Sequence, residues 1–311
     1  MFGIKKAKGG LKQRFIDMNR IGSERIQNRS NKELLEELFS HVSRTFKGLS
    51  RAKKSKKYNE EIDQSTRLKV DQTFWDELIE YAKSIGIDLV GFTEVDEYFI
   101  FEEEMTDYRV KDGVLDNAIV LGMEMDKNRI EQAPEPPAGV EAMKIYADLG
   151  DATNKLAQYL RERGFKAQAF HPFGGPVLYP PIAEKAGLGE IGVNGVLISR
   201  EFGPRQRLSM IATDASPLPD IKKPELGIRE YCKTCEACVK ACPGGAIYPS
   251  NKKKRSPDGK YLQNIDGDKC FPHFFKHFGC SICIKVCPFS KLGYDKTMKK
   301  KRAVLTATTR D

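Results

Sequence analysis

The chain has 311 residues, of which 40% are hydrophobic and 31% are charged, and its formal net charge at pH 7 is +9. This length allows two modest domains with a buried core. No apolar run approaches the roughly 20 residues that a membrane-spanning helix needs, and residues 1–6 are not followed by the apolar stretch of a signal peptide. The composition therefore predicts a soluble, cytoplasmic protein.

Positive charge is concentrated at the two ends of the chain. Residues 1–60 carry a net charge of +10 and residues 291–311 carry +5, whereas residues 61–290 sum to −6. Basic ends can bind nucleic acid, an acidic membrane surface or an acidic protein, and they can equally be solvated tails. We interpret residues 1–65 as a basic helical N-terminal extension and residues 296–311 as a basic tail.

The apolar pattern predicts helices mixed with short strands. Ser30 to Glu33 has the spacing of a capping box before an amphipathic helix, and residues 51–57 are predicted to form an exposed linker. Proline is expected to keep residues 131–139 in a loop. Further helices are predicted at 73–84 and 145–160, and strands at 87–92, 118–123, 166–170, 196–199 and 208–213. This mixture predicts an α+β or α/β domain over residues 66–225.

All eight cysteines lie in a short part of the chain, between positions 232 and 287. Such a cluster in a cytosolic protein favours metal binding over disulfides. The first four form the run Cys232-x2-Cys235-x2-Cys238-x3-Cys242-Pro243, which is typical of bacterial ferredoxins. Downstream, Cys280-x2-Cys283-x3-Cys287-Pro288 repeats the second half of the pattern, and Cys270 supplies its missing first member. The count matches the eight thiolates that two 4Fe–4S clusters require.

In two-cluster ferredoxins the last cysteine of each run binds the other cluster. Cluster one is therefore predicted to use Cys232, Cys235, Cys238 and Cys287, and cluster two Cys242, Cys270, Cys280 and Cys283. The alternatives are zinc sites or buried free thiols, but zinc ribbons use two Cys-x2-Cys pairs rather than a four-cysteine run. We interpret the nearby His273 and His277 as packing residues. Residues 226–295 are predicted to form a two-cluster ferredoxin-like domain.

A glycine-rich segment at residues 187–192 fits the dinucleotide-binding pattern G-x-G-x-x-G. That motif should follow a strand and open a helix. Here residues 181–186 are predicted to be helical and residues 196–198 to be a strand, so the order is reversed and we reject a dinucleotide site. The glycines at 187, 189, 192 and 195 either bring the backbone close to a bulky group or allow turns with positive φ.

The sequences AGLGEIGVNG at 186–195 and LISREFGPRQR at 197–207 resemble the corrinoid-binding core of reductive dehalogenases. Residues 268–291 resemble the end of the same family, and residues 145–167 are similar to its helix that carries the catalytic tyrosine. The resemblance covers roughly residues 70–295. It implies an α+β fold in which a nitroreductase-like, corrinoid-binding domain carries a dicluster ferredoxin-like module.

The same resemblance implies a reductase in which two 4Fe–4S clusters reduce a cobalamin that cleaves a small organic substrate. It implies that Tyr146 donates a proton, and that Arg205 stabilises the phenolate, holds an anionic leaving group or contacts the phosphate tail of the corrinoid. One wall of the corrinoid site is expected to be formed by Gly187, Gly189, Gly192, Asn194 and Gly195, with Asn194 bonded to a propionamide. The expected electron donor is a low-potential protein such as ferredoxin or flavodoxin.

Two other functions remain open. Epoxyqueuosine reductase, which acts on tRNA, shares both domains, and in this chain the basic ends and residues 252–255 would contact the tRNA. That family typically has Trp where Glu190 stands and Asp near the position of Tyr146, so the sequence departs from it at both places. The third function is a two-cluster electron carrier that binds no corrinoid.

Overall fold

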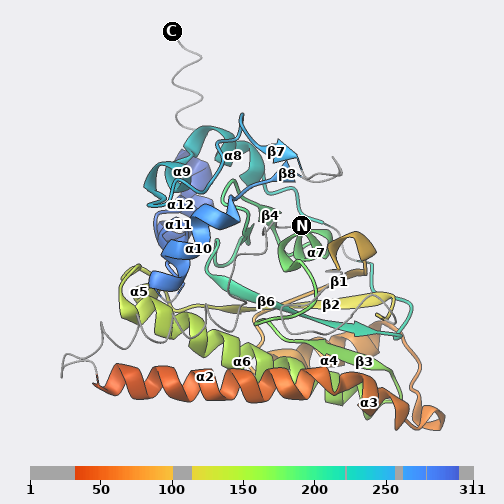
Figure 1. The fold of residues 1–311 in the computed structure, drawn as a ribbon. Helices are drawn as coiled ribbons and strands as arrows, with labels where there is room; N and C mark the ends of the chain where they lie inside the picture. Colours follow the sequence, from red (N-terminus) through yellow and green to blue (C-terminus); the bar gives the residue numbers. More distant parts are fainter. Residues whose placement is uncertain (1–31, 101–113, 221–222, 256–261, 278, 301–311) are drawn as a thin grey trace.

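The computed structural model describes residues 32–100, 114–220, 223–255, 262–277 and 279–300 (Figure 1). Its centre is a four-stranded antiparallel sheet with the strand order β1-β2-β6-β3. The strands are β1 (Leu89–Glu94), β2 (Asn117–Glu124), β3 (Ala167–Phe170) and β6 (Gln206–Thr213). The four strands predicted at these places are thereby confirmed, with ends that differ by about two residues.

Both faces of this sheet are buried, because side chains alternate along each strand. On β2, Ile119 and Leu121 belong to one core cluster, whereas Ala118 and Val120 belong to the other. Helices α4 (Gln72–Ser84) and α6 (Pro136–Arg161) cover the first face, and α7 (Tyr179–Lys185) covers the second (Figure 1). The sheet with its three helices forms the scaffold that positions the candidate site.

The N-terminal helix α2 (Lys32–Lys53) runs along α6, and α3 (Ser55–Glu60) contacts β3 (Figure 1). The prediction of an exposed linker at residues 51–57 is therefore wrong. Lysine and arginine are good helix formers, and the intervening Ala52 and Ser55 are buried, whereas Arg51, Lys54 and Lys57 are exposed beside two packed helices. Ser30 and Asn31 of the predicted capping box lie outside the described residues.

Helix α6 begins earlier than predicted, because Pro136 opens it instead of interrupting a loop. Proline is well suited to the first turn of a helix, where its missing N–H has no intrahelical partner. The predicted loop at 131–139 is thus wrong over residues 136–139, and residues 127–130 form the short helix α5 (Lys127–Ile130). Tyr146 consequently lies almost three turns inside α6 instead of at its start.

The cysteine-rich part of the chain consists of short elements on the side of the sheet that α7 covers (Figure 1). The hairpin β4 (Glu190–Ile191) and β5 (Leu197–Ile198), which contacts this part, follows α7 in the reversed helix-then-strand order that the sequence predicted. Its elements are α8 (Ile228–Cys235), α9 (Ala237–Ala241), β7 (Lys254–Arg255), β8 (Leu262–Gln263), α10 (Gly267–Lys276), α11 (Ile282–Lys285) and α12 (Pro288–Lys291). None of the helices that the structure describes is long and apolar enough to span a bilayer.

Candidate functional site

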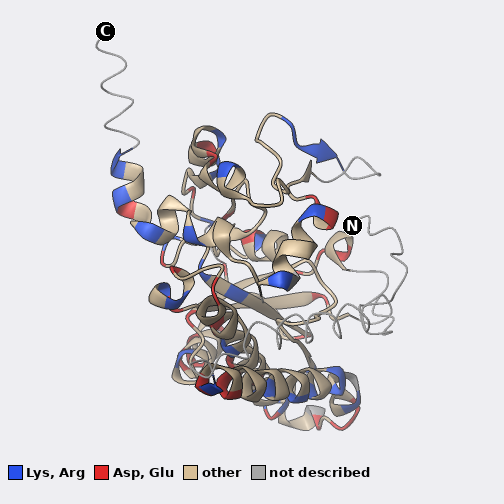
Figure 2. Cartoon of the chain, turned by 60° about the vertical axis from the view of Figure 1, so that its left-hand side comes forward, with Lys and Arg blue, Asp and Glu red and all other residues tan. Residues whose placement is uncertain are grey.

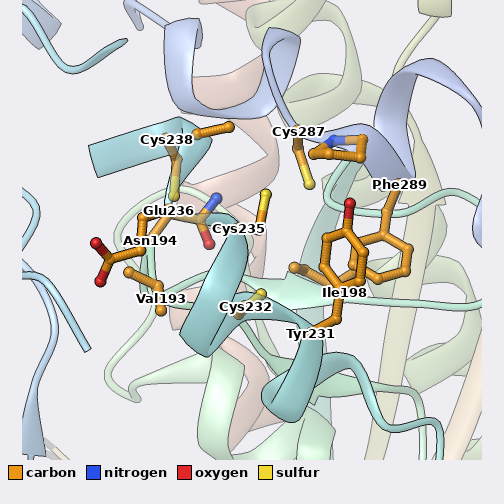
Figure 3. A pocket seen from close by; sticks show the side chains of 12 residues that line it. Val193, Asn194, Ile198, Tyr231, Cys232, Cys235, Glu236, Cys238, Cys287 and Phe289 are labelled. Atoms are coloured by element: carbon orange, nitrogen blue, oxygen red, sulfur yellow. The ribbon is translucent and has the colours of Figure 1, made fainter. Parts of the chain in front are cut away.

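A pocket that is partly open to solvent is lined by four cysteines together with neighbouring residues (Figure 3). Cys232 and Cys235 lie on α8 and Cys238 on α9, whereas Cys287 directly precedes α12. The fourth cysteine therefore comes from a segment about 50 residues further along the chain. These are the four residues that the spacing assigns to cluster one.

The other four cysteines form a second group around Cys283. Burial raises the pKa of the Cys270 thiol to about 11, and the nearby Cys242 and Cys280 act in the same direction. Burial also raises the pKa of Cys283, with further contributions from Cys238 and from the other three members of its group. The two groups thus adjoin each other at Cys238 and Cys283. His273 packs nearby against Gly244.

This environment disfavours free thiolates. Burial raises the pKa of both Cys238 and Cys287 to about 12, and the neighbouring cysteines contribute to each shift. Binding of a metal removes such protons, because the metal's positive charge stabilises the thiolate. Among the described residues, no three His, Cys, Asp or Glu side chains converge tightly enough to hold one metal ion.

The glycine-rich segment packs tightly against the chain itself. A Cβ atom on Gly189 would lie 2.3 Å from the Ile198 carbonyl oxygen, and one on Gly192 would lie 2.6 Å from Ile198 Cδ1. Gly195 has a φ of +74°, and its Cβ would meet Asn264 at 3.1 Å. The tight β4–β5 hairpin accounts for these three glycines. Their role in a corrinoid site, together with that of Gly187, stays a prediction.

Glu190 joins the hairpin to the first cysteine-bearing helix. Its Oε1 accepts the backbone N–H groups of Leu226 at 2.7 Å and Gly227 at 2.9 Å, and its Oε2 accepts that of Arg229 at 2.8 Å. A carboxylate at this position satisfies the open N–H groups at the start of α8 and complements the helix dipole. The sequence analysis did not find this role, because the partners lie at least 36 residues away.

Asn194 lies on the wall of the cysteine pocket (Figure 3). It is only 1% exposed, and its Oδ1 has no hydrogen-bond partner within the part of the chain that the structure describes. A buried amide without a partner is costly unless a ligand supplies one. The orphaned oxygen is an acceptor, so it fits a bound group that donates a hydrogen bond.

Tyr146 contacts a different arginine from the one that the sequence suggested. The guanidinium of Arg207 lies over the Tyr146 ring, with its Cζ atom 4.6 Å from the ring centroid, and Phe173 packs edge-on against the same ring at 5.4 Å. Arg205 forms an ion pair with Glu124 and donates to the Met125 carbonyl at 3.2 Å. Arg207 could have been noticed from its spacing, since residues two apart on an extended segment share a face.

Both arginines also offer an open hydrogen-bond donor. The Nε atoms of Arg205 and Arg207 are buried and have no partner among the described side chains and backbone groups. Buried guanidinium nitrogens are normally paired. These two donors therefore fit a ligand with polar or anionic groups, such as the amide and phosphate groups of a corrinoid.

Comparison with known protein families identifies the kind of domain that the cysteine-rich region forms. Residues 231–290 match the family described as 4Fe-4S double cluster binding domain, and this stretch contains all eight cysteines. The chain thus carries a domain for two 4Fe–4S clusters.

Comparison with individual proteins points to two kinds of reductase. Tetrachloroethene reductive dehalogenases of Desulfitobacterium hafniense and Sulfurospirillum multivorans are 32% and 30% identical to the chain, over 57% and 64% of its length and 33% and 41% of their own. An epoxyqueuosine reductase of Francisella cf. novicida is 35% identical over 49% of the chain and 45% of its own length. The chain spans about a third to under half of these relatives.

A solved structure of a catabolic reductive dehalogenase in complex with 3-bromo-4-hydroxybenzoic acid shares the fold. Its TM-score is 0.61 at 21% sequence identity, and the match covers 71% of this chain and 32% of that one. The mixed helix-and-sheet fold with a dicluster module and the resemblance to both kinds of reductase are thereby confirmed.

Proposed function

We propose that the chain is an oxidoreductase in which two 4Fe–4S clusters pass single electrons to a cobalamin that cleaves a small organic substrate reductively, as in a dehalogenase. The observation that carries this proposal is the convergence of Cys287 with Cys232, Cys235 and Cys238 on one pocket. A single-cluster site would need no such exchange between the two cysteine runs, whereas a two-cluster ferredoxin does. Cluster two is then bound by Cys242, Cys270, Cys280 and Cys283.

The cobalamin part of the proposal is supported by a similar fold and by the open Nε donors of Arg205 and Arg207. A solved reductive dehalogenase with a TM-score of 0.61 is described as suggesting a mechanism for B12-dependent dehalogenation. Bound cobalamin supplies a cobalt centre that is reduced by single electrons. In this chain the Nε groups of Arg205 and Arg207 would hold its polar groups, and the segment 187–195 would border it.

Tyr146 would deliver the proton that reductive cleavage consumes. Its hydroxyl is the donor, and the guanidinium of Arg207 stabilises the phenolate that remains after transfer because the positive charge lies over the ring. The ion pair with Glu124 orients Arg205, which leaves its Nε free to bind an anionic leaving group or a polar group of the cofactor.

Metal and sulfide analysis after anaerobic reconstitution tests this function directly. We expect about eight iron and eight sulfide per chain, and stoichiometric cobalt when cobalamin is offered. Replacing Cys270 with Ser should leave about four iron, because only one cluster then keeps its four thiolates. Full iron without retained cobalt would instead identify a two-cluster electron carrier, and about four iron in the parent would contradict the two-cluster proposal.

A second candidate function, reduction of epoxyqueuosine in tRNA, is favoured by the distribution of charge. Figure 2 shows Lys and Arg gathered on β7 and on the last described helical segment; the exposed ones are Lys252, Lys254, Arg255, Lys296, Lys299 and Lys300. Each of these two separate basic patches suits a phosphate backbone. Binding of tRNA that weakens steeply with salt, together with turnover of epoxyqueuosine-containing tRNA, would select this function over the dehalogenase-like one.

A further inference from the structure

The residue just before the first cysteine places a hydroxyl group inside the cluster-one pocket. Tyr231 lies on α8 and lines the pocket, and its hydroxyl points inward on the side where Cys235 and Cys287 lie (Figure 3). The Cys235 side chain lies within hydrogen-bonding reach of this hydroxyl. The proposed function uses the cysteines as ligands but assigns no role to this hydroxyl.

The Tyr231 side chain is held in this orientation by its surroundings. Its ring packs edge-on against Phe289 at 5.0 Å, and Phe289 in turn stacks on Tyr294 at 6.1 Å. The backbone N–H of Tyr231 donates to the Gly227 carbonyl at 3.1 Å, and Gly227 itself donates to Glu190. Because ring and backbone are both held by neighbouring residues, the hydroxyl keeps one orientation toward the cysteines in the folded region.

We propose that Tyr231 donates a hydrogen bond to a thiolate ligand of cluster one and thereby raises the reduction potential of that cluster. The inference rests on the proposed function, since it requires that the cluster is present. A phenol hydroxyl is a donor, and an iron-bound thiolate is an acceptor. Reduction adds one electron to the cluster, so a donor aimed at its sulfur stabilises the reduced, more negative form, and hydrogen bonds to the sulfurs help to set cluster potentials.

A higher reduction potential would favour electron transfer to cluster one, which borders the β4–β5 hairpin. Val193, Asn194 and Ile198 of that hairpin line the same pocket as the four cysteines. The segment is continuous with the proposed corrinoid-binding region. Each reduction transfers one electron from a low-potential donor to cluster one, and Tyr231 keeps its proton.

The test compares two tyrosine-to-phenylalanine variants in the reconstituted full-length chain. Tyr231→Phe removes the hydroxyl that faces the cysteines. Tyr294→Phe is the matched control, because its ring packs on the same Phe289 while its hydroxyl donates at 2.7 Å to the Leu226 carbonyl. Redox titration followed by electron paramagnetic resonance should show two reduction steps in the parent.

We expect Tyr231→Phe to shift one of the two steps to lower potential and to leave the other unchanged. At the parental midpoint of that step, the reduced-to-oxidised ratio should fall roughly tenfold, which corresponds to about 59 mV for one electron. Tyr294→Phe should match the parent. If neither step moves while iron and sulfide stay at about eight per chain, or if both steps move equally, the inference is wrong although the two clusters stand.

A measurement on the parent protein alone covers the case in which Tyr231→Phe fails to assemble its clusters. Electron–nuclear double resonance of the reduced protein in H₂O and D₂O should detect an exchangeable proton coupled to cluster one at hydroxyl distance. Backbone N–H groups near the ligands also exchange, so selective labelling with ring-deuterated tyrosine identifies the tyrosine beside the cluster. Absence of a tyrosine ring coupling would overturn the inference, whereas a parent that holds only about four iron would overturn the proposed function itself.

Discussion

The sheet region and the cysteine region are held together by different forces. Around the sheet, two large clusters of buried apolar side chains fill both faces, and Trp75, Leu78, Leu149 and Leu156 are at most 1% exposed. Within the described part of the cysteine region, the core cluster comprises only Leu226, Ile228, Cys287 and Phe289, together with Ile198 from the hairpin. Regions with so little apolar burial depend on metals or cross-links for stability. The sheet region should therefore fold without a cofactor, whereas the cysteine region should not.

Removal of iron should unfold the cysteine region and leave the sheet region folded, and this is the largest effect that we expect. After chelation under anaerobic conditions, the amides of α8 and α9 should lose their protection against hydrogen exchange by orders of magnitude, because the metal-binding free energy of such a region is also its folding free energy. The amides of β2 and β6 should remain protected. Hydrogen exchange read by mass spectrometry checks both regions at once, and an equal loss in both would show that they form one cooperative unit.

A change of Tyr146 in the sheet region should lower turnover, while both clusters remain bound. Tyr146→Phe removes the proposed proton donor, so turnover should fall by roughly 100-fold or more, the usual scale for loss of a positioned general acid. The matched control is Tyr159→Phe on the same helix, because an arginine, Arg163, also lies over the ring of Tyr159, at 3.3 Å. Rates are to be measured on whichever of aryl halides, alkyl halides and epoxyqueuosine-containing tRNA is turned over by the parent. A Tyr146→Phe enzyme as fast as the parent would make this tyrosine a packing residue.

The same turnover assay compares the contributions of Arg205 and Arg207. Arg207→Met removes the cation over the Tyr146 ring, and turnover should fall about tenfold, since each 1.4 kcal/mol of transition-state stabilisation is a factor of ten. Arg207→Lys should recover part of this loss, because it restores the charge without the planar guanidinium. Arg205→Met should also release Glu124, and its effect should appear mainly as weaker binding of cofactor or substrate. A larger loss of turnover from Arg205→Met than from Arg207→Met would assign stabilisation of the Tyr146 phenolate to Arg205 instead.

The two regions also differ in how far the sequence predicts them. The cysteine ligands follow from their spacing, because ferredoxin-type runs place thiolates around a cubane and the last cysteine of each run binds the other cluster. The strands at 118–123 and 208–213 follow from apolar runs, since both faces of the sheet are buried. The contact between Tyr146 and Arg207 joins residues from α6 and β6, and no local pattern encodes it. The same holds for the burial of Ala52 and Ser55, which converts a basic run from an expected linker into helix.

Glu190 is one of the contacts that join the sheet region to the cysteine region, and its removal should have the smallest effect of this series. Glu190→Gln keeps one acceptor oxygen but removes the charge that faces three backbone N–H groups at the start of α8. Loss of a charge-assisted bond in a half-exposed site should lower the stability of the cysteine region by about 1 kcal/mol. Glu201→Gln, in an exposed position of the next turn, is the control.

The expected effect of Glu190→Gln on amide exchange is small and confined to one part of the chain. Amides at the start of α8 should exchange several-fold faster in Glu190→Gln, while β2 and β6 keep their parental rates, because the carboxylate touches only the junction between the regions. Both clusters should still assemble, since all eight thiolates are unchanged. If amide exchange in α8 is slower or unchanged in Glu190→Gln, water stabilises the helix start as well as the carboxylate does. The order of the cysteine region then comes from the clusters alone. If the variant fails to take up iron, the junction is needed to pre-arrange the ligands, and the two regions are more tightly coupled than their separate cores suggest.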